Sequence, residues 1–596
     1  MDKVNKEITP EILKGIEFLY NYLGSEGRSL LKKVAPKNDE IVSFEFPLPE
    51  DYLGIARTLR IGFCKNFPIS GLQLQILPSA WLEWPHVMPN FVCLYGFGEE
   101  SSGTSAELVI RDNMQRLSKL VQLILPESDV NNRNKEFFRE ITPYWQMQLK
   151  KNKQQLTLLM QPTKSCELYV LTDQREATNR EKQIVWLAEN ILDLEQHLTK
   201  LLNRKQRVTA PANAGFYIRL KSHPGVKIPS QESIIAWLSD HISEQDKILL
   251  NAWFVKSSNY PKRWLLIEVP DTNPSVIQSI VLRHKGIKED SYYIYGRRAA
   301  RRIINVDQSV SQLSSLEYCP VHLLSKSTIH SRDTELVNED FSSKKVAIIG
   351  AGSLGSAVIM QLVRAGVNNL TLIDPDKFES ANLGRHVLGI DDLGQNKTDA
   401  LKERIHKDVP FTNIKSIPKR IQDILIEKID LLKDIDVVVI TSANWFSEDF
   451  IWFFRELTKQ KWALIQGWAE PHAIVGHVLV TPSNSNDNAS YMFDHNGNFN
   501  YKFTEWPDNG QIALPGCGHG FIPGGPISIS QIANLMAQTT IDVLIGKITE
   551  KLWLSSIGDL EKVQLAQGTY IGPTLPHGCK QIVISQQWPS EENLNG

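Results

Sequence analysis

The chain of 596 residues is longer than one hydrophobic core usually supports, so its length predicts three or four domains. Hydrophobic residues make up 42% of it, charged residues 22%, and the net charge is only −2, which excludes a strong overall attraction to nucleic acid or to an anionic membrane. No apolar run has signal-peptide or membrane-spanning length, and the six cysteines form no CxxC pair. The composition therefore predicts a soluble cytoplasmic protein with neither a zinc ribbon nor a disulfide framework.

The first block, residues 1–150, combines helical and strand-like patterns. ITPEILKGIEFLYNYLG has apolar residues at helical spacing, and IVSFEFPLP, ARTLRIGFCK and LQLQILP read as strands separated by proline and glycine. An irregular stretch, WPHVMPNFVCLYG, carries Cys93 and precedes the amphipathic helix AELVIRDNMQRLSKLVQLIL. This order predicts an α+β domain made of a helix, an antiparallel meander, a loop with one cysteine and a second helix.

The second block, residues 151–330, predicts an α+β linker domain. EKQIVWLAENILDLEQHLTKLLNRK and ESIIAWLSDHI are predicted helices, whereas LTLLMQ, CELYVLT, GFYIRLK, ILLNAWFV and RWLLIEV are predicted strands. The basic run GRRAARR at 296–302 fits a solvated helix face better than an anion-binding site. The block carries no chemical motif, so we expect a scaffold or docking role.

The third block, residues 331–596, opens with a glycine fingerprint between a strand and a helix. VAIIG is a short buried-type strand, GAGSLG turns the chain, SAVIMQLVRAG is a helix, and LTLID is the next strand. Gly350 and Gly352 permit a sharp turn and a close approach to phosphate, and Gly355 permits tight packing of helix on strand. Asp374, 19 residues past Gly355, ends the second strand, where a carboxylate can bind ribose hydroxyls. A Rossmann-like nucleotide site is predicted, with NAD and ATP as alternatives.

The residues after Asp374 favour ATP. Asp376, Asn382, Arg385 and Lys397 all follow within 23 residues of it. Hydride transfer leaves the pyrophosphate of NAD intact, so it needs no cluster of cations there. Adenylation releases pyrophosphate, and positioned arginine, lysine and metal must stabilise the charge that develops on this leaving group.

Together these motifs resemble the activating-enzyme superfamily, which includes the ThiF- and MoeB-type sulfur-carrier adenylyltransferases and the ubiquitin-activating enzymes. The shared pattern is a glycine turn, Asp-x-Asp, Asn-Leu-x-Arg and a following lysine, and it spans 48 residues in this chain. The resemblance implies that Asp374 holds the ribose of ATP. It implies that Asn382, Arg385 and Lys397 contact the phosphates and the target carboxylate, and that the protein is a homodimer in which Arg332 reaches the partner's site.

One departure from the family pattern concerns magnesium. The metal-binding aspartate of the family follows the next strand in a Thr-Asp-Asn context, whereas this chain reads TSAN after DVVVI, with Ala443 in that place. Coordination of Mg²⁺ by Asp376, by another group such as Asp449, or by ATP itself are the alternatives. The metal ligand therefore stays unassigned.

Cys517 is the predicted first acceptor of the activated acyl group. It lies in LPGCGHGFIPGGPISIS, before a predicted long helix, and this position is similar to the cysteine loop of activating enzymes. The thiolate is the nucleophile, and His519 is a candidate activator. The alternative is a structural cysteine in a tight turn, but Gly516 and Gly518 offer it little apolar wall.

The first block resembles a ubiquitin-conjugating enzyme, with Cys93 as the thioester cysteine. In the eukaryotic pattern His-Pro-Asn precedes the cysteine by several residues, and the asparagine helps to stabilise the oxyanion of lysine attack. Here the order is Pro85-His86, and Asn90 lies only three residues before Cys93. The oxyanion donor is therefore an open question. The remaining cysteines are interpreted as structural: Cys64, Cys166, Cys319 and Cys579.

As a whole, the chain resembles bacterial fusions of a conjugating-enzyme domain with an activating-enzyme domain in CBASS anti-phage operons. The resemblance implies ATP-dependent activation of a protein C-terminus, capture on Cys517, transfer to Cys93 and conjugation to a target amine. It implies a cGAS-like nucleotidyltransferase as the protein substrate. Two alternatives are a sulfur-carrier adenylyltransferase, which stops at the adenylate or thiocarboxylate, and a nonenzymatic scaffold with a degenerate nucleotide site.

The predicted fold class is thus a multidomain α/β protein. An N-terminal α+β conjugating-enzyme-like fold is followed by the α+β linker domain and by a C-terminal Rossmann-like ThiF-type adenylation domain.

Overall fold

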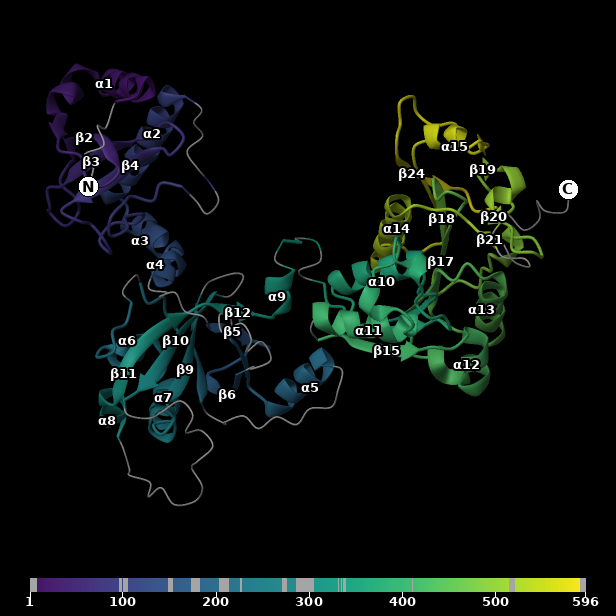
Figure 1. Cartoon of the computed structure of the whole chain (residues 1–596). Helices are drawn as coiled ribbons and strands as arrows, with labels where there is room; N and C mark the ends of the chain where they lie inside the picture. Colours follow the sequence, from purple (N-terminus) through teal and green to yellow (C-terminus); the bar gives the residue numbers. More distant parts are fainter. Residues whose placement is uncertain are drawn as a thin grey trace. The chain divides into compact units, whose positions relative to one another are not determined.

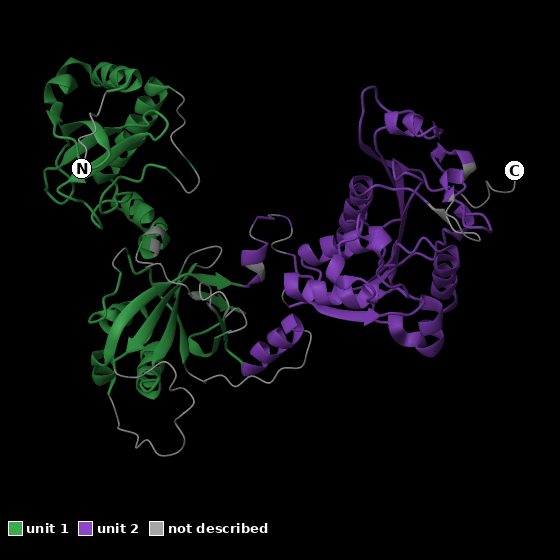
Figure 2. Cartoon of the chain, in the orientation of Figure 1, with its two compact units in different colours: residues 1–190, 210–323 green, residues 191–209, 324–596 purple. Residues whose placement is uncertain are grey.

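A computed structural model divides the chain into two compact units (Figures 1 and 2). Unit 1 comprises residues 1–190 and 210–323, and unit 2 comprises residues 191–209 and 324–596. Among the residues that the structure describes, no helix has both the length and the hydropathy needed to span a membrane. The described residues are 8–95, 99, 105–147, 154–172, 183–202, 214–225, 228–270, 276–285, 305–330, 332–333, 335, 339–409, 411–513 and 520–589.

The N-terminal part of unit 1 is an antiparallel meander that packs with two amphipathic helices, in the predicted order. Its strands pair in chain order, β1-β2-β3-β4. Thr9 and Ser105 cap the two helices, and each side chain accepts a hydrogen bond from a backbone N–H three residues further on. Alternate positions of β3, such as Ile61 and Phe63, join the helices in one core. The elements are α1 (Pro10–Leu30), β1 (Lys32–Val34), β2 (Glu40–Pro47), β3 (Thr58–Cys64), β4 (Leu72–Leu77) and α2 (Ala106–Ile124).

Two short helices, α3 (Val130–Arg139) and α4 (Ile141–Met147), connect the meander to the second sheet of unit 1. Trp145 of α4 is 1% exposed and belongs to the hydrophobic cluster of that sheet. Its Nε1 donates a hydrogen bond to the carbonyl oxygen of Ser279 at 3.4 Å. The second sheet therefore anchors the helix that follows α3.

The second sheet of unit 1 has eight strands in the order β11-β10-β9-β8-β6-β7-β5-β12. Central strand β9 is buried at every position because its alternate residues enter two separate clusters, Leu265 in one and Trp264 in the other. Its strands are β5 (Gln154–Leu158), β6 (Cys166–Thr172), β7 (Gln183–Ala188), β8 (Gly215–Arg219), β9 (Lys262–Val269), β10 (Val276–His284), β11 (Leu313–Cys319) and β12 (Val321–Leu323). Its helices are α6 (Ile234–His241), α7 (Glu244–Lys256) and α8 (Val306–Ser311).

Two predictions for this block were wrong. The segment 248–255, predicted as a strand, lies within helix α7, because Ser243 caps the helix and Leu250, Trp253 and Phe254 bury one helical face. The predicted helix 181–205 begins as strand β7, whose β-branched and aromatic residues pair with β5 and β6. The basic run 296–302 lies outside the described residues.

Unit 2 contains an eight-stranded sheet in the order β15-β14-β13-β16-β17-β18-β22-β24. The strands from β15 to β17 are parallel, and the remaining ones are antiparallel. Its strands are β13 (Lys345–Ile349), β14 (Asn369–Ile373), β15 (Asn413–Ile417), β16 (Val437–Ile440), β17 (Ala463–Ala469), β18 (Val475–Thr481), β22 (Leu552–Ile557) and β24 (Ile582–Gln586). Short strands outside this sheet are β19 (Thr504–Glu505), β20 (Ile512–Ala513), β21 (Gly520–Phe521) and β23 (Thr569–Tyr570).

Helices cover both faces of this sheet. On β13, Val346 and Ile348 join the cluster that contains α10, α11 and α14, whereas Ala347 and Ile349 join the cluster that contains α12 and α13. This alternation is the pattern of a doubly wound, Rossmann-like fold, as predicted. The helices are α9 (Lys326–Ile329), α10 (Ser353–Arg364), α11 (Lys397–Asp408), α12 (Ile421–Glu427), α13 (Trp445–Leu457), α14 (Pro526–Leu544) and α15 (Glu561–Leu565).

Helix α5 (Ile191–Leu202) belongs to unit 2, although its sequence lies within the second block (Figure 2). The Nζ of Lys200 donates a hydrogen bond to the carbonyl oxygen of Thr412 at 2.7 Å. Burial, together with the charges of Lys200 and Lys402, lowers the pKa of His406 on α11 to about 4. Helix α5 thus docks on α11 through a lysine and a neutral histidine.

Candidate active site

The glycine turn between β13 and α10 depends on two close backbone approaches. Gly350 has a φ of +95°, and a Cβ there would lie 2.7 Å from the backbone of Ser442. A Cβ on Gly355 would lie 2.1 Å from the carbonyl oxygen of Gly350 and 2.5 Å from Oγ1 of Thr441. Gly352 is the N-cap of α10, and no described atom lies within 4 Å of where its Cβ would be. The turn therefore requires Gly350 and Gly355, and it leaves space at the start of α10, where backbone N–H groups favour an anion.

Asp374, just after β14, is bound to this turn. Its Oδ2 accepts a hydrogen bond from the N–H of Ala351 at 2.6 Å, and its Oδ1 accepts one from the N–H of Asp376 at 2.8 Å. Burial raises the pKa of Asp374, while the two backbone bonds and the charge of Lys397 act in the opposite direction. A carboxylate offers about four acceptor positions, so capacity remains for ribose hydroxyls.

Lys397 and Asp376 form an ion pair at the same edge of the sheet. The Nζ of Lys397 lies 2.9 Å from Oδ2 of Asp376, and the two side chains are 9% and 63% exposed. The backbone N–H of Lys397 also donates to the carbonyl of Asp376 at 3.0 Å. The ammonium is therefore held in place at the start of α11, where the ion pair that involves described residues is with the exposed carboxylate of Asp376.

Asn382 and Arg385 lie on a short turn that contacts the start of α10. The side-chain oxygen of Asn382 accepts the N–H of Glu379 at 3.0 Å, and its carbonyl accepts the N–H of Arg385 at 3.0 Å. The Oγ of Ser353, the first residue of α10, donates to the carbonyl of Arg385 at 2.9 Å. Direct hydrogen bonds thus connect the glycine turn to Asp374 and to Arg385, and Asp376 in turn binds Lys397 at the start of α11.

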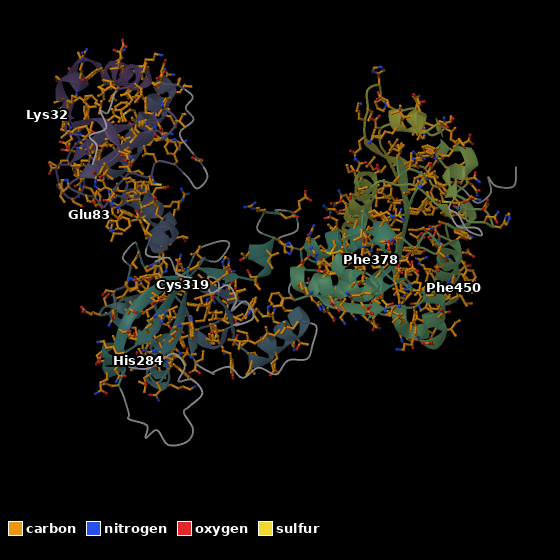
Figure 3. The ribbon with its side chains drawn as sticks, viewed as in Figure 1. Lys32, Glu83, His284, Cys319, Phe378 and Phe450 are labelled. Carbon is orange, nitrogen blue, oxygen red and sulfur yellow. The ribbon has the colours of Figure 1, made fainter. Side chains whose placement is uncertain are left out.

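His386 is a residue of this site that the sequence analysis missed. Its Nε2–H donates to the carbonyl of Ala351 at 2.7 Å, and its Nδ1 accepts the N–H of Leu388 at 3.2 Å. Burial lowers the pKa of His386, which agrees with the neutral tautomer that these bonds require. The ring packs on Phe378, labelled in Figure 3, with ring centroids 5.1 Å apart. Its position directly after Arg385 was the available signal.

The segment after β16 contains Ala443, at a φ of +48°, where the family pattern has an acid. Glu448, in the first turn of α13, is buried against this segment. Its Oε1 accepts hydrogen bonds from the Oγ of Ser442 at 3.0 Å and from the N–H of Asn444 at 3.2 Å, and its Oε2 accepts one from Gln466 at 2.8 Å. Burial raises the pKa of Glu448. This carboxyl holds the segment, and sequence reasoning did not identify it.

The described residues fit a magnesium ion that arrives with ATP better than a resident metal. They contain no group of three or more His, Cys, Asp or Glu side chains placed to hold a metal ion. Asp449 is exposed on α13, whereas Asp376 stands beside Lys397 at the edge that carries the glycine turn. Mg²⁺ commonly uses one or two carboxylates together with substrate phosphates, and Asp376 is the acid available for that purpose.

Three other residues of unit 2 were predicted to take part in the reaction. Cys517 and His519 lie outside the described residues, between β20 and β21. Arg332 is exposed in a turn of unit 2.

In unit 1, Cys93 ends a small antiparallel hairpin. Val87 and Val92 form a bridge, and the N–H of Cys93 donates to the carbonyl of His86 at 2.7 Å. The pair makes this one backbone bond, because His86 has a φ of +60° and its own N–H donates to Glu140. Asn90 is exposed at the tip of the hairpin, beside Pro89. The asparagine nearest in sequence is thus at the opposite end of the hairpin from the thiol.

His86 has an acidic environment built from the end of α3. Its Nδ1 lies 2.6 Å from Oε1 of Glu140, and its Nε2 lies 3.5 Å from Oε2 of Glu136. Oε2 of Glu140 also accepts the backbone N–H of His86 at 2.7 Å and the hydroxyl of Tyr144 at 2.6 Å. Burial alone would lower the pKa of His86, but the two carboxylates outweigh it and the pKa is raised. Burial and the charge of Glu140 raise the pKa of Cys93.

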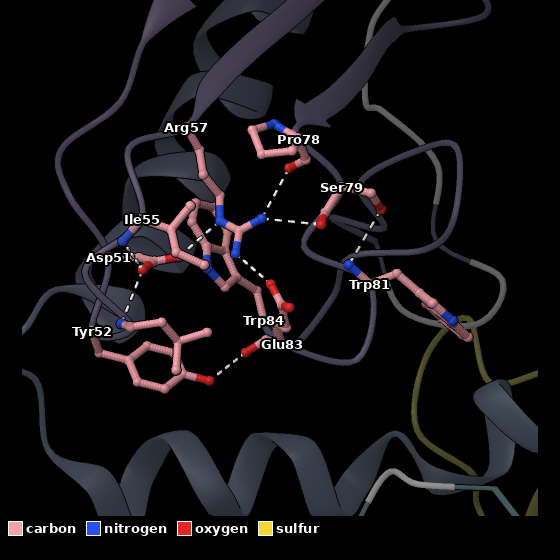
Figure 4. A network of polar contacts seen from close by, with 10 residues as sticks. Asp51, Tyr52, Ile55, Arg57, Pro78, Ser79, Trp81, Glu83 and Trp84 are labelled. Carbon is pink, nitrogen blue, oxygen red and sulfur yellow. Dashed lines mark hydrogen bonds and ion pairs between the residues drawn. The ribbon is translucent and has the colours of Figure 1, made fainter.

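A buried ion network holds the chain just before this hairpin (Figure 4). The guanidinium of Arg57 binds Oδ2 of Asp51 at 2.7 Å and also contacts Glu83. Its Nη1 donates to the carbonyls of Pro78 and Ser79 at 2.9 and 3.0 Å. The Arg57 and Asp51 side chains are 1% and 0% exposed. Arg57 therefore fixes the segment that leads to His86.

The geometry of unit 2 defines a class of protein. A glycine turn, a carboxylate after the second strand and an ammonium at the next helix meet at the carboxyl ends of β13 and β14, on a doubly wound sheet. This is the arrangement of Rossmann-like nucleotide-binding domains. Residues 330–564 match the ThiF family, and this part of the chain is a ThiF-family domain.

Relatives of known name match parts of the chain. An ATP-dependent ubiquitin transferase-like protein Cap2 from Enterobacter hormaechei subsp. hoffmannii is 43% identical over 77 residues, 13% of this chain and 13% of the relative. A Cap2 protein from Pseudomonas aeruginosa is 25% identical over 221 residues, 36% of this chain and 39% of the relative. These matches therefore span well under half of each relative.

Among solved structures, E. coli MccB with MccA-N7isoASN is 19% identical. It covers 38% of this chain and 68% of that protein, with a TM-score of 0.29.

Proposed function

We propose that this chain is an ATP-dependent enzyme that activates the C-terminal carboxylate of a protein and conjugates it to a target amine. The observation that carries the first half is the hydrogen-bonded junction of the nucleotide site. Ala351, in the glycine turn, binds both Asp374 and His386, and Lys397 is fixed beside Asp376. The matches to the ThiF family and to transferase-like relatives support the same class of reaction.

In the proposed first step, a carboxylate oxygen of the substrate attacks the α-phosphorus of ATP. The bond to the β-phosphate oxygen breaks, which gives an acyl adenylate and pyrophosphate. Lys397 and Arg385 stabilise the charge that develops on the phosphates, and Asp374 orients the ribose. Asp376 would be the protein ligand of a Mg²⁺ ion that arrives with ATP, and this ion would supply further charge stabilisation.

In the proposed second and third steps, the thiolate of Cys517 displaces AMP to form a thioester, and Cys93 takes the acyl group by thioester exchange. We assign Cys93 to a conjugating-enzyme-like fold. A helix, a four-stranded meander, a hairpin ending in a cysteine and a second helix support that assignment. Attack by an amine on the Cys93 thioester then gives an amide and the free thiol.

The proposed substrate is a cGAS-like nucleotidyltransferase in anti-phage defence, and the proposed assembly is a homodimer. Both rest on the resemblance to CBASS fusions, which the relatives named Cap2 support. We also place the reaction in the cytoplasm, on the same resemblance.

Exchange of labelled pyrophosphate into ATP tests the proposal. With the C-terminal peptide of a nucleotidyltransferase from the same operon, we expect exchange that depends on the peptide and on Mg²⁺. Exchange without any thioester would favour a sulfur-carrier adenylyltransferase. Absence of exchange would favour a nonenzymatic scaffold.

A further inference from the structure

The thiol site of unit 1 contains a histidine whose role the proposed reaction leaves unassigned. The hairpin joins His86 to Cys93 through one backbone hydrogen bond, from the N–H of Cys93 to the carbonyl of His86 at 2.7 Å, and Glu140 acts on both residues. Asn90, by contrast, is three residues from Cys93 along an extended chain, which is about 10 Å. The residue type expected to stabilise an oxyanion is therefore at the far end of the hairpin, and a histidine stands beside the thiol.

Glu140 fixes His86 through two contacts and is itself held by a third, with Tyr144. One carboxylate oxygen binds Nδ1 of the ring, and the other accepts the backbone N–H of His86 and the hydroxyl of Tyr144. The Glu140 side chain is 8% exposed, so these bonds form away from water and are correspondingly strong. The imidazole is thus oriented by a carboxylate that is itself fixed.

The second ring nitrogen is held much less firmly. Nε2 lies 3.5 Å from Glu136, at the outer limit of a hydrogen bond, and Glu136 also binds Arg139 at 2.7 Å. The His86 side chain is 34% exposed, so an incoming group can reach it. Among the described residues, Glu140 and Glu136 are the charged groups that act on this ring, while Tyr144 and Cys93 both interact with Glu140. Both ring nitrogens face carboxylates, which raise the pKa of His86 and favour the doubly protonated ring.

We propose that the imidazolium of His86, oriented by Glu140, is the hydrogen-bond donor that stabilises the oxyanion formed when an amine attacks a thioester on Cys93. The inference rests on the proposed role of Cys93 as acyl carrier. The amine nitrogen bonds to the carbonyl carbon, and the carbonyl electron pair moves to oxygen, where Nε2–H of His86 meets it. Collapse re-forms the carbonyl and breaks the C–S bond. The thiolate takes the proton that the amine loses, and His86 keeps its own.

The raised pKa of Cys93 agrees with this role. A thiolate of high pKa is readily protonated once it has left, but it is a poor leaving group. Aminolysis of such a thioester therefore gains from stabilisation of the tetrahedral intermediate.

The test needs neither ATP nor Cys517. The full chain is acetylated on its thiols with p-nitrophenyl acetate, excess reagent is removed, and hydroxylamine is added. Mass spectrometry then follows loss of acetyl from Cys93, with Cys579, a partly exposed thiol of the same chain, as internal reference. Both thioesters react with the same hydroxylamine, so the pH dependence of its protonation affects both rates equally and cancels in their ratio. A missing pyrophosphate exchange would thus overturn the proposed function while leaving this measurement informative.

In the wild type we expect the Cys93 to Cys579 ratio to fall as pH rises above 6.5 through the raised pKa of His86. A ratio that rises with pH would indicate that His86 acts as a general base. A ratio that stays flat would show that the protonation of His86 has no effect. Either result would overturn the proposal. His86→Phe, which removes the donor, should lower the ratio about 10²- to 10³-fold. His86→Gln, which keeps a neutral donor, should restore part of it, and His322→Gln, an exposed histidine of unit 1, should change nothing. An unchanged ratio in folded His86→Phe would also refute the proposed role.

Discussion

The two candidate sites of this protein are built in different ways. In unit 2 the nucleotide site comes from one stretch of about 50 residues, and its side chains are joined through the backbone of the glycine turn. In unit 1 the Cys93 site joins a hairpin to the end of α3, 54 residues away in sequence between His86 and Glu140. The first kind of site can be recognised as a motif, whereas the second exists only after the helix has packed.

Each site contains a histidine, and the pKa values of the two are shifted in opposite directions. His386 donates to one backbone carbonyl and accepts from one N–H, which requires a neutral ring. His86 lies between two carboxylates, which favour the charged ring. Burial pushes both pKa values downward, and only the carboxylates reverse that effect. The immediate partner, rather than burial, decides what each histidine can do.

The largest expected effect separates the two thiols. Cys517→Ala should abolish thioesters on both cysteines and leave pyrophosphate exchange largely intact, because adenylation needs no thiol. Cys93→Ala should leave a thioester on Cys517 without transfer to the final acceptor. Nonreducing and reducing gels with ATP and the cognate C-terminus measure both. A Cys517→Ala protein that still charges Cys93 would mean that Cys93 attacks the adenylate directly.

The next largest effect is expected from removing Lys397, the fixed cation of unit 2. Lys397→Ala should slow pyrophosphate exchange about 10²- to 10³-fold, since it removes preorganised charge stabilisation from the transition state. Lys407→Ala, on the exposed end of the same helix, is the matched control and should be close to wild type. Equal effects of the two substitutions would show that only the net charge of α11 matters.

A third change concerns the stability of unit 1. Arg57→Met leaves Asp51 buried without its ionic partner, which should cost about 3–5 kcal/mol in the free energy of unfolding. Arg111→Met breaks an exposed pair with Glu107 and should cost less than about 1 kcal/mol. Denaturant unfolding measures both variants. Pyrophosphate exchange should survive Arg57→Met under native conditions, and its loss would contradict the independence of the two sites.

The smallest effect is the difference in titration between the two histidines. NMR should give a midpoint above 6.5 for His86 and below 6.5 for His386, with His86→Gln and His386→Gln used to assign the signals. The raised pKa of His86 adds stability that is full below pH 6.5 and is lost as pH rises through the folded value. The lowered pKa of His386 adds stability that is present above pH 6.5 and is lost as pH falls through the folded value. If the pKa values of His86 and His386 both lay above or both below 6.5, the proposed difference between the two histidines would be wrong.

The local sequence pattern predicted the secondary structure correctly where an element's conformation depends mainly on its own residues. The meander of unit 1 and the strand, turn and helix around Gly350 follow the predicted order. Prediction failed at 248–255, where an apolar run fits a buried strand and a buried helix equally well. It failed again at 183–188, where continuity with the following helical pattern concealed strand β7. In both cases tertiary partners decided the outcome.

By itself, the sequence determined the nucleotide-binding class of unit 2. Gly350, Gly355 and Asp374 act through the backbone of neighbouring segments, so their spacing already encodes their geometry. Only the tertiary structure revealed that Glu448 binds the segment that contains Ala443 and that Glu140 binds His86. A buried carboxylate acquires its role from the partner that packing brings to it, and no local pattern records a partner that lies far away in the chain.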